Sequence, residues 1–269
     1  MLNDSSKDDS SVFPVPVSPG SKIARVPWNP WLAVVFIGFI FYISQFFGSL
    51  TVYIYPWLMH WTTAQADQWL STSVLAQFTY VLLAETFMLG AIYAFLKKYK
   101  TNFGIIGLTS PKWRDIGLGL LAAPLYYAVY VVSVAIISHF VRGLNVNQIQ
   151  DIGFSNVSNV AQMVLTFTSL VVLPPLVEEI MVRGFLYSSL KKAMPKVAAI
   201  VVTSLIFASA HLPEGGANGP LYIAALDTFI LSLVLIYLRE RTGSLWASIT
   251  LHGIKNGIAF IALFVLHFR

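Results

Sequence analysis

Cysteine is absent from the 269 residues, and charge is scarce, since Asp, Glu, Lys and Arg together make up only 11% of the chain. The missing cysteine excludes disulfides, thiolate metal sites and a cysteine nucleophile. The shortage of charge excludes an ordinary soluble domain, of which roughly a quarter is charged. Hydrophobic residues make up 57%, and the mean hydropathy is +0.71. We therefore expect an integral, multi-pass membrane protein whose nearest partners are membrane lipids.

Nucleic acid is not an expected partner, although the net charge is +5 and the pI is near 9.3. The basic residues form short clusters between apolar runs, as the positive-inside rule describes for cytoplasmic connections. The N-terminus is therefore expected in the cytoplasm and the C-terminus outside, and we expect a bacterial plasma membrane. The clusters are Lys22 and Arg25; Lys97, Lys98, Lys100, Lys112 and Arg114; Lys191, Lys192 and Lys196; Arg239 and Arg241.

Seven apolar runs approach the roughly 20 residues with which a helix crosses a bilayer. They predict an all-α, polytopic transmembrane helical bundle with seven spans, eight being the alternative, around an intramembrane polar cavity. Residues 1–27 are rich in Ser, Asp and Pro, so we expect a disordered cytoplasmic tail followed by one transmembrane domain over 28–269. The spans are expected at 31–56, 73–96, 115–139, 160–190, 196–212, 220–238 and 244–267.

Three charges interrupt the fourth run in the stretch LVEEIMVRGF, and each costs roughly 2.5 to 3.5 kcal/mol in mid-membrane. Residues four apart share a helix face, whereas neighbours differ by about 100°. Glu179 and Arg183 are therefore predicted to pair, which leaves Glu178 to face a cavity. Pro174 and Pro175 precede the glutamates, and a proline kink beside charge favours a cavity, with an ordinary packing kink as the alternative.

Two later runs carry polar residues at the same predicted depth. FASAH contains Phe207 and His211, and LHGIKN contains His252 and Asn256. At ~1.5 Å per residue, Glu178 lies ~20 Å above Lys191, His211 ~22 Å above Lys196, and His252 ~16 Å above Arg241. We expect the four polar groups to line one site in the motif-bearing core, about 160–260, although each histidine could instead be a packing residue and the asparagine an interhelical tie.

A glutamate, two histidines and an asparagine at one level can hydrolyse a bond. The carboxylate can act as general base on a water, while His and Asn donate to a developing oxyanion. Glu178, His211 and His252 could also be three zinc ligands with water as the fourth, but no HExxH motif places two ligands on one turn. No cofactor is favoured, and zinc is the alternative.

Glu85, Asp227 and Lys255 are also expected inside the membrane. Lys255 is predicted to pair with Asp227 or with Glu85, because a charge at this depth needs a partner. For these three residues a structural role is favoured.

The order EExxxR, FxxxH, HxxxN resembles the CPBP family of CAAX proteases and bacteriocin-processing enzymes, also called Abi or type II CAAX prenyl endopeptidase-like proteins. The resemblance implies an intramembrane endopeptidase, described in part of the family as a metalloprotease. Its substrate would be a membrane-associated protein or peptide, prenylated or not, reached from the cytoplasm. Glu178 would activate the water with His211, and His252 and Asn256 would stabilise the oxyanion. Glu179, Arg183 and Phe207 would support them.

Two other functions stay open. A non-catalytic membrane protein of the same fold, such as a bacteriocin-immunity or scaffold protein, would use the polar cluster only to bind a partner. A proton-coupled transporter would use the intramembrane Glu and His as a relay, but the chain shows no inverted repeat.

Overall fold

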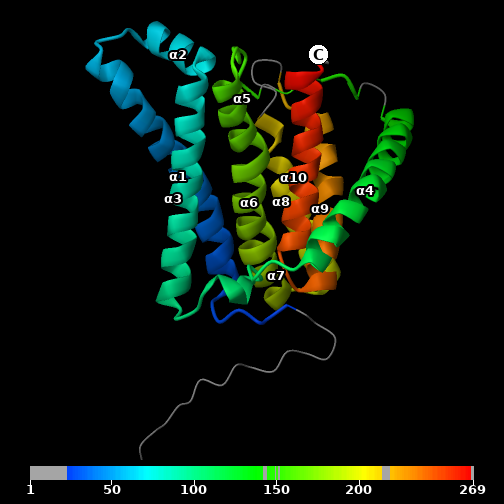
Figure 1. The fold of residues 1–269 in the computed structure, drawn as a ribbon. Coiled ribbons are helices and arrows are strands. Elements are labelled where there is room, and N and C mark those ends of the chain that lie inside the picture. Colours follow the sequence, from blue (N-terminus) through cyan, green and yellow to red (C-terminus); the bar gives the residue numbers. More distant parts are fainter. Residues whose placement is uncertain (1–22, 142–143, 149, 151, 214–218, 268–269) are drawn as a thin grey trace, which may run out of the picture.

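The computed structural model describes residues 23–141, 144–148, 150, 152–213 and 219–267, and throughout these residues the regular secondary structure is helical (Figure 1). Six of the helices are long and apolar enough to cross a membrane. The expectation of an all-α, multi-pass membrane protein is therefore confirmed. The expected tail lies outside the described residues as far as residue 22.

The helices follow the predicted apolar runs closely. The fourth run is one continuous helical rod over 160–193 that is built from five segments. The elements are α1 (Pro30–Leu58), α2 (Thr63–Thr72), α3 (Val74–Lys98), η1 (Phe103–Ile106), α4 (Trp113–Phe140), α5 (Val160–Phe167), η2 (Thr168–Val172), α6 (Leu173–Glu178), η3 (Glu179–Leu186), α7 (Tyr187–Ala193), α8 (Lys196–Ser209), α9 (Tyr222–Thr242), α10 (Trp246–Phe260) and η5 (Ile261–Val265).

The fifth expected span, 196–212, is occupied by the shorter helix α8. It has 14 residues, a rise of ~21 Å against a hydrocarbon core of ~30 Å. Pro213 follows closely, and proline cannot continue a helix. The connection at 57–72, between the first two expected spans, contains α2, which begins at a reciprocal capping box formed by Thr62 and Gln65.

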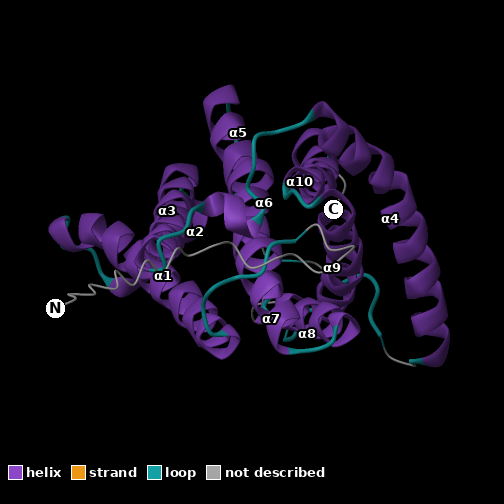
Figure 2. Cartoon of the chain, turned by 90° about the horizontal axis from the view of Figure 1, so that it is seen from below, coloured by secondary structure: helices purple, strands orange, loops and turns teal. Residues whose placement is uncertain are grey.

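The rod over 160–193 runs through the middle of the bundle (Figures 1 and 2). The pair α1 and α3 lies on one side, helices α8, α9 and α10 lie on the other, and α4 is outermost, in contact with α9 and α10. One apolar core joins α1 and α3 to the rod, and a second joins α4, α9 and α10.

Two stretches of the rod, η2 and η3, are π-helical, and they flank Pro174 and Pro175. Proline has no N–H, so the helical hydrogen-bond ladder is interrupted at these positions. Single π-helical turns in an α-helix often mark functional sites. In this rod, Glu178 is the last residue before η3 and Glu179 is the first residue in it.

The chain is anchored beneath the rod before α1 begins. Trp28 is fully buried, donates to Ser189 Oγ at 2.7 Å and stacks on Phe185 at 5.0 Å between ring centroids. Ile23 and Val26 are also buried, at 5% and 1% exposure. The folded part of the chain therefore reaches back at least to Ile23, before the domain start expected at residue 28.

Candidate active site

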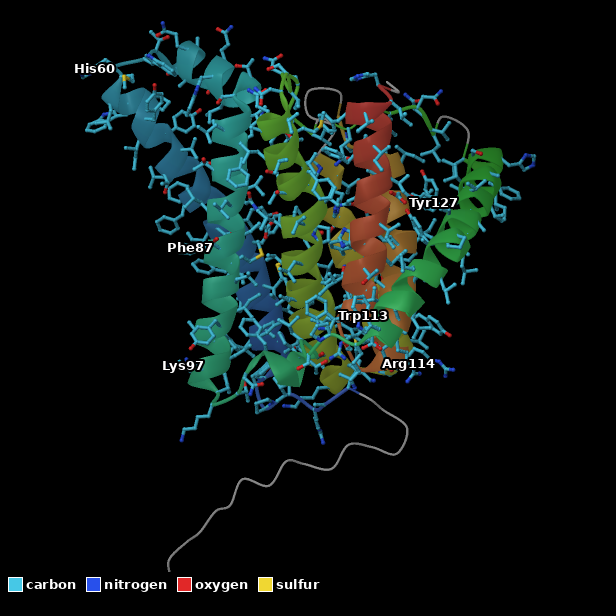
Figure 3. All side chains as sticks on the ribbon, viewed as in Figure 1. His60, Phe87, Lys97, Trp113, Arg114 and Tyr127 are labelled. Atoms are coloured by element: carbon cyan, nitrogen blue, oxygen red, sulfur yellow. The ribbon has the colours of Figure 1, made fainter. Side chains whose placement is uncertain are left out.

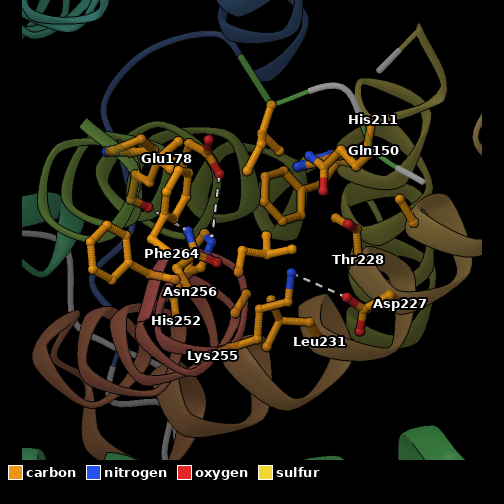
Figure 4. A pocket seen from close by; sticks show the side chains of 18 residues that line it. Gln150, Glu178, His211, Asp227, Thr228, Leu231, His252, Lys255, Asn256 and Phe264 are labelled. Carbon is orange, nitrogen blue, oxygen red and sulfur yellow. Dashed lines mark hydrogen bonds and ion pairs between the residues drawn. The ribbon is translucent and has the colours of Figure 1, made fainter. Parts of the chain in front are cut away.

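A cavity of about 230 Å³ lies between the rod and helices α8, α9 and α10 (Figure 4). Glu178, Phe207, His211, His252 and Asn256 all line it, so the structure brings the predicted polar residues together. The other lining residues are Gln150, Ile152, Leu170, Pro174, Ala224, Asp227, Thr228, Leu231, Lys255, Ala259, Phe260, Leu263 and Phe264.

Glu178 and Glu179 have different surroundings although they are neighbours in sequence. The Glu178 side chain is 24% exposed at the cavity wall, whereas Glu179 is fully buried behind it. Glu179 Oε1 accepts from Arg183 Nη1 at 2.9 Å, and Arg183 is also fully buried. The predicted ion pair is therefore present.

Glu179 has a second partner that the sequence reasoning missed. Its Oε1 also accepts from His252 Nδ1, at 3.0 Å. An ionised carboxylate only accepts hydrogen bonds, so Nδ1 of His252 carries the proton. In the neutral ring the lone pair is then on Nε2, which lies 3.8 Å from Glu178 Oε2. One glutamate thus orients the histidine toward the other.

Phe207 forms the partition between the buried pair and the cavity. Its ring lies under the guanidinium of Arg183, with Cζ 4.1 Å from the centroid, and meets the His211 ring edge to face at 4.9 Å. His211 donates from Nδ1 to the carbonyl of Phe207 at 2.9 Å. Because that carbonyl only accepts, neutral His211 also carries its lone pair on Nε2.

Asn256 ties α10 to the rod at a gap in the rod's backbone bonding. Its Nδ2 donates to the carbonyl of Leu170 at 2.9 Å. The residues four and five positions after Leu170 are Pro174 and Pro175, so neither an α-type nor a π-type hydrogen bond to this carbonyl can form. The asparagine thus links α10 to the rod, and its second amide N–H remains able to donate another hydrogen bond.

A second polar group lies across the cavity from Glu178. Lys255 Nζ pairs with Asp227 Oδ2 at 3.1 Å, and Tyr126 of α4 donates to Asp227 Oδ1. This is one of the two pairings that the sequence predicted. Thr228, one position after the aspartate, also lines the cavity, and no feature of the sequence singled it out.

The side chains do not form a ready metal site. Among the described residues, no group of three or more His, Asp or Glu side chains is placed so as to hold a metal ion. The two histidine tautomers would suit zinc, since each presents Nε2 while Nδ1 is held by an acceptor. Glu178, His211 and His252 are nevertheless not placed so as to hold the ion together.

Among curated proteins and among solved structures, no match to this chain was found. A family model described as Type II CAAX prenyl endopeptidase Rce1-like matches residues 160–258. That segment contains the whole rod, α8, α9 and the HxxxN motif, and therefore every residue predicted for the site. The family match supports a protease, and over residues 160–258 the resemblance inferred from the three motifs is confirmed as one to the Rce1-like type II CAAX prenyl endopeptidases.

Proposed function

We propose that this protein is an intramembrane endopeptidase in which Glu178 activates a water for attack on a peptide bond. The observation that carries the proposal is the placement of Glu178 Oε2 3.8 Å from His252 Nε2 at the wall of a cavity. A water that donates to two acceptors at ~2.8 Å holds them roughly 4 to 4.5 Å apart. The observed 3.8 Å is slightly shorter and Glu178 Oε2 is itself buried, so the two side chains must move apart by a few tenths of an ångström to share one water from the cavity.

Glu178 is the general base. It takes a proton from the water as the water oxygen bonds to the carbonyl carbon, and it returns that proton to the leaving nitrogen as the C–N bond breaks. His252 aligns the water through Nε2, because Glu179 fixes its tautomer from the other side of the ring. His211 also presents Nε2 as an acceptor, but both hydrogens of this water are already donated, so His211 would accept from an N–H of the bound peptide.

The remaining groups stabilise charge. Asn256 keeps one amide N–H on Leu170 and offers the other to the developing oxyanion. Arg183 neutralises Glu179, so the buried carboxylate can hold His252 without leaving an uncompensated charge. The substrate class that fits is a peptide segment able to reach the membrane interior, prenylated or not.

The test uses the isosteric variant Glu178→Gln. Purified wild-type and variant proteins in lipid vesicles are incubated with a farnesylated CAAX peptide and, separately, with a mixed library of membrane-active peptides. Wild-type protein should cleave, and the variant should be slower by at least 10²-fold, the lower range for loss of a general base.

The matched control is Glu85→Gln, which changes another largely buried intramembrane carboxylate that does not line the cavity. It should retain cleavage. Equal activity in Glu178→Gln and wild type would remove the proposal and favour the non-catalytic alternative, in which the cavity only binds a partner.

A further inference from the structure

The two ends of the bundle differ in charge. Figure 3 shows Lys97 and Arg114 at one end and His60 at the other. The end with Lys97 also holds the turn between α7 and α8 and the last turn of α9, with Lys191, Lys196 and Arg239. By the positive-inside rule this basic end faces the cytoplasm. The connections at the opposite end contain a single basic residue, Arg142, which lies outside the described residues.

The cavity lies in the half of the bundle away from the basic end. On the rod it touches Leu170, Pro174 and Glu178, which precede the basic turn of α7. On α9 its lining residues fall within 224–231, ahead of the basic last turn at Arg239, and on α10 they begin only at His252. The same holds for α8, where the cavity touches Phe207 near its C-terminal end and His211 two residues beyond that end, far from Lys196.

The half of the bundle toward the basic end is filled by side chains. Every residue of the rod from Glu179 to Leu190 is buried. Facing it, Leu235, Ile236, Leu245 and Ser248 are each 0% exposed. No lining residue of the cavity comes from this layer. Toward the other end, by contrast, the lining residues Gln150, Ala259 and Leu263 are exposed at the surface.

We infer that the site is reached from the extracytoplasmic side, and that its substrate is a peptide segment presented on that side of the membrane. That a substrate enters the site rests on the proposed peptidase function. The direction from which the cavity is reached depends only on the fold. It replaces the cytoplasmic opening that the family resemblance implies. A secreted peptide or an external segment of a membrane protein fits, and a prenylated C-terminus that stays in the cytoplasm does not.

The absence of native cysteine makes access measurable with single substitutions. Ala224→Cys places a thiol on the cavity wall, and Ala247→Cys places the same group in the filled layer, where Ala247 is 0% exposed. Lys97→Cys marks the basic end. Right-side-out and inverted vesicles are treated with a sulfonated methanethiosulfonate, which does not cross the membrane.

The inference predicts that A224C reacts in right-side-out vesicles, K97C only in inverted vesicles, and A247C in neither. Reaction of A224C only from the inverted side, or from neither side, overturns it. Reaction of K97C from outside overturns the orientation on which it depends.

A second readout follows cleavage itself. A membrane-impermeant fluorogenic peptide library is added to sealed vesicles of each orientation, with Glu178→Gln vesicles as the blank. Cleavage should occur at least tenfold faster in right-side-out vesicles, and faster cleavage in inverted vesicles contradicts the inference. If labelling shows external access but no preparation cleaves, the peptidase proposal fails while the direction of access stands.

Discussion

Glu179 accepts hydrogen bonds from both Arg183 and His252 through the same oxygen, Oε1, at 2.9 and 3.0 Å. One buried carboxylate thus holds Arg183 of the rod and also His252 of α10, which lies 73 positions after Glu179 in sequence. The second glutamate of the EExxxR motif therefore fixes the orientation of the histidine that the first glutamate faces.

Glu179→Gln should be strongly destabilising, because it leaves Arg183 charged and unpaired in the interior. Removing one partner of a buried ion pair costs roughly 3 to 5 kcal/mol. The double variant Glu179→Gln/Arg183→Met should recover much of that stability and yet stay inactive, since His252 no longer donates to a carboxylate. Thermal unfolding in detergent and a cleavage assay check the two halves. A double variant with wild-type activity would show that the tie to His252 is dispensable.

Asn256→Ala should cost about 1 kcal/mol, because the part-buried Leu170 carbonyl then loses its donor. Pro174→Ala supplies a backbone N–H four residues after Leu170. This N–H can donate to the Leu170 carbonyl within the rod and so replace the Asn256 amide. We therefore expect the double variant Asn256→Ala/Pro174→Ala to lose less free energy of unfolding than the sum of the losses in the two single variants. Additive losses in a double-mutant cycle would mean that the proline is unrelated to the asparagine tie.

Asp227→Asn should lower the melting temperature more than the double variant Asp227→Asn/Lys255→Met does. The single change leaves the Lys255 ammonium without the carboxylate that it pairs with at 3.1 Å, whereas the double change removes both charges. Melting temperatures of the two variants in the same detergent test this ordering. The reverse order would show that Lys255 has an equally good anionic partner elsewhere.

Gly119→Ala should separate α4 from α10. A Cβ at Gly119 would lie 2.6 Å from the Ala247 carbonyl oxygen and 2.7 Å from Thr250 Cβ, so one helix must move. Overpacking of this kind costs typically ~1 to 3 kcal/mol. Gly117→Ala is the control on the same helix, because nothing lies within 4 Å of its Cβ position. It should be neutral or slightly stabilising in the same unfolding measurement.

Trp28→Ala should cost roughly 3 to 5 kcal/mol, as expected for loss of a buried tryptophan. Trp31, which is 59% exposed on the outer surface of α1, provides the comparison, and Trp31→Ala should have little effect on unfolding in detergent. Equal effects would mean that the segment before α1 does not anchor the rod through the Trp28–Ser189 hydrogen bond.

Much of the fold could be predicted from the sequence because membrane-spanning helices are recognisable as long apolar runs. The helix at 160–193 was expected at 160–190, and the one at 74–98 was expected at 73–96. The short α8 could not be told from a full span, since an apolar run continues past the point where the helix ends at Ser209. The anchoring of Trp28 was hidden for a different reason. It lies between Pro27 and Asn29, ahead of the first apolar run, and its partners Phe185 and Ser189 come from the far end of the rod.

The site could be predicted where contacts lie within one helix. The Glu179–Arg183 pair follows from spacing alone, and the common depth of Glu178, His211 and His252 follows from counting residues. The tie between His252 and Glu179 could not be predicted, because it depends on how α10 is rotated against the rod. The same is true of Asn256 and the Leu170 carbonyl, where the acceptor is a backbone atom of an apolar residue with no sequence signature.

The two prolines also set the direction in which the neighbouring carboxylate points. Leu170 is held to α10, and Pro174, Pro175 and Glu178 follow at fixed intervals on the same rod. Each residue of a helix turns the next by about 100°, so adding or deleting one residue between Pro175 and Glu178 would swing the glutamate away from the cavity. The number of residues between the prolines and the glutamate therefore fixes the direction of the carboxylate, separately from the packing of the Leu176 and Val177 side chains against the apolar core.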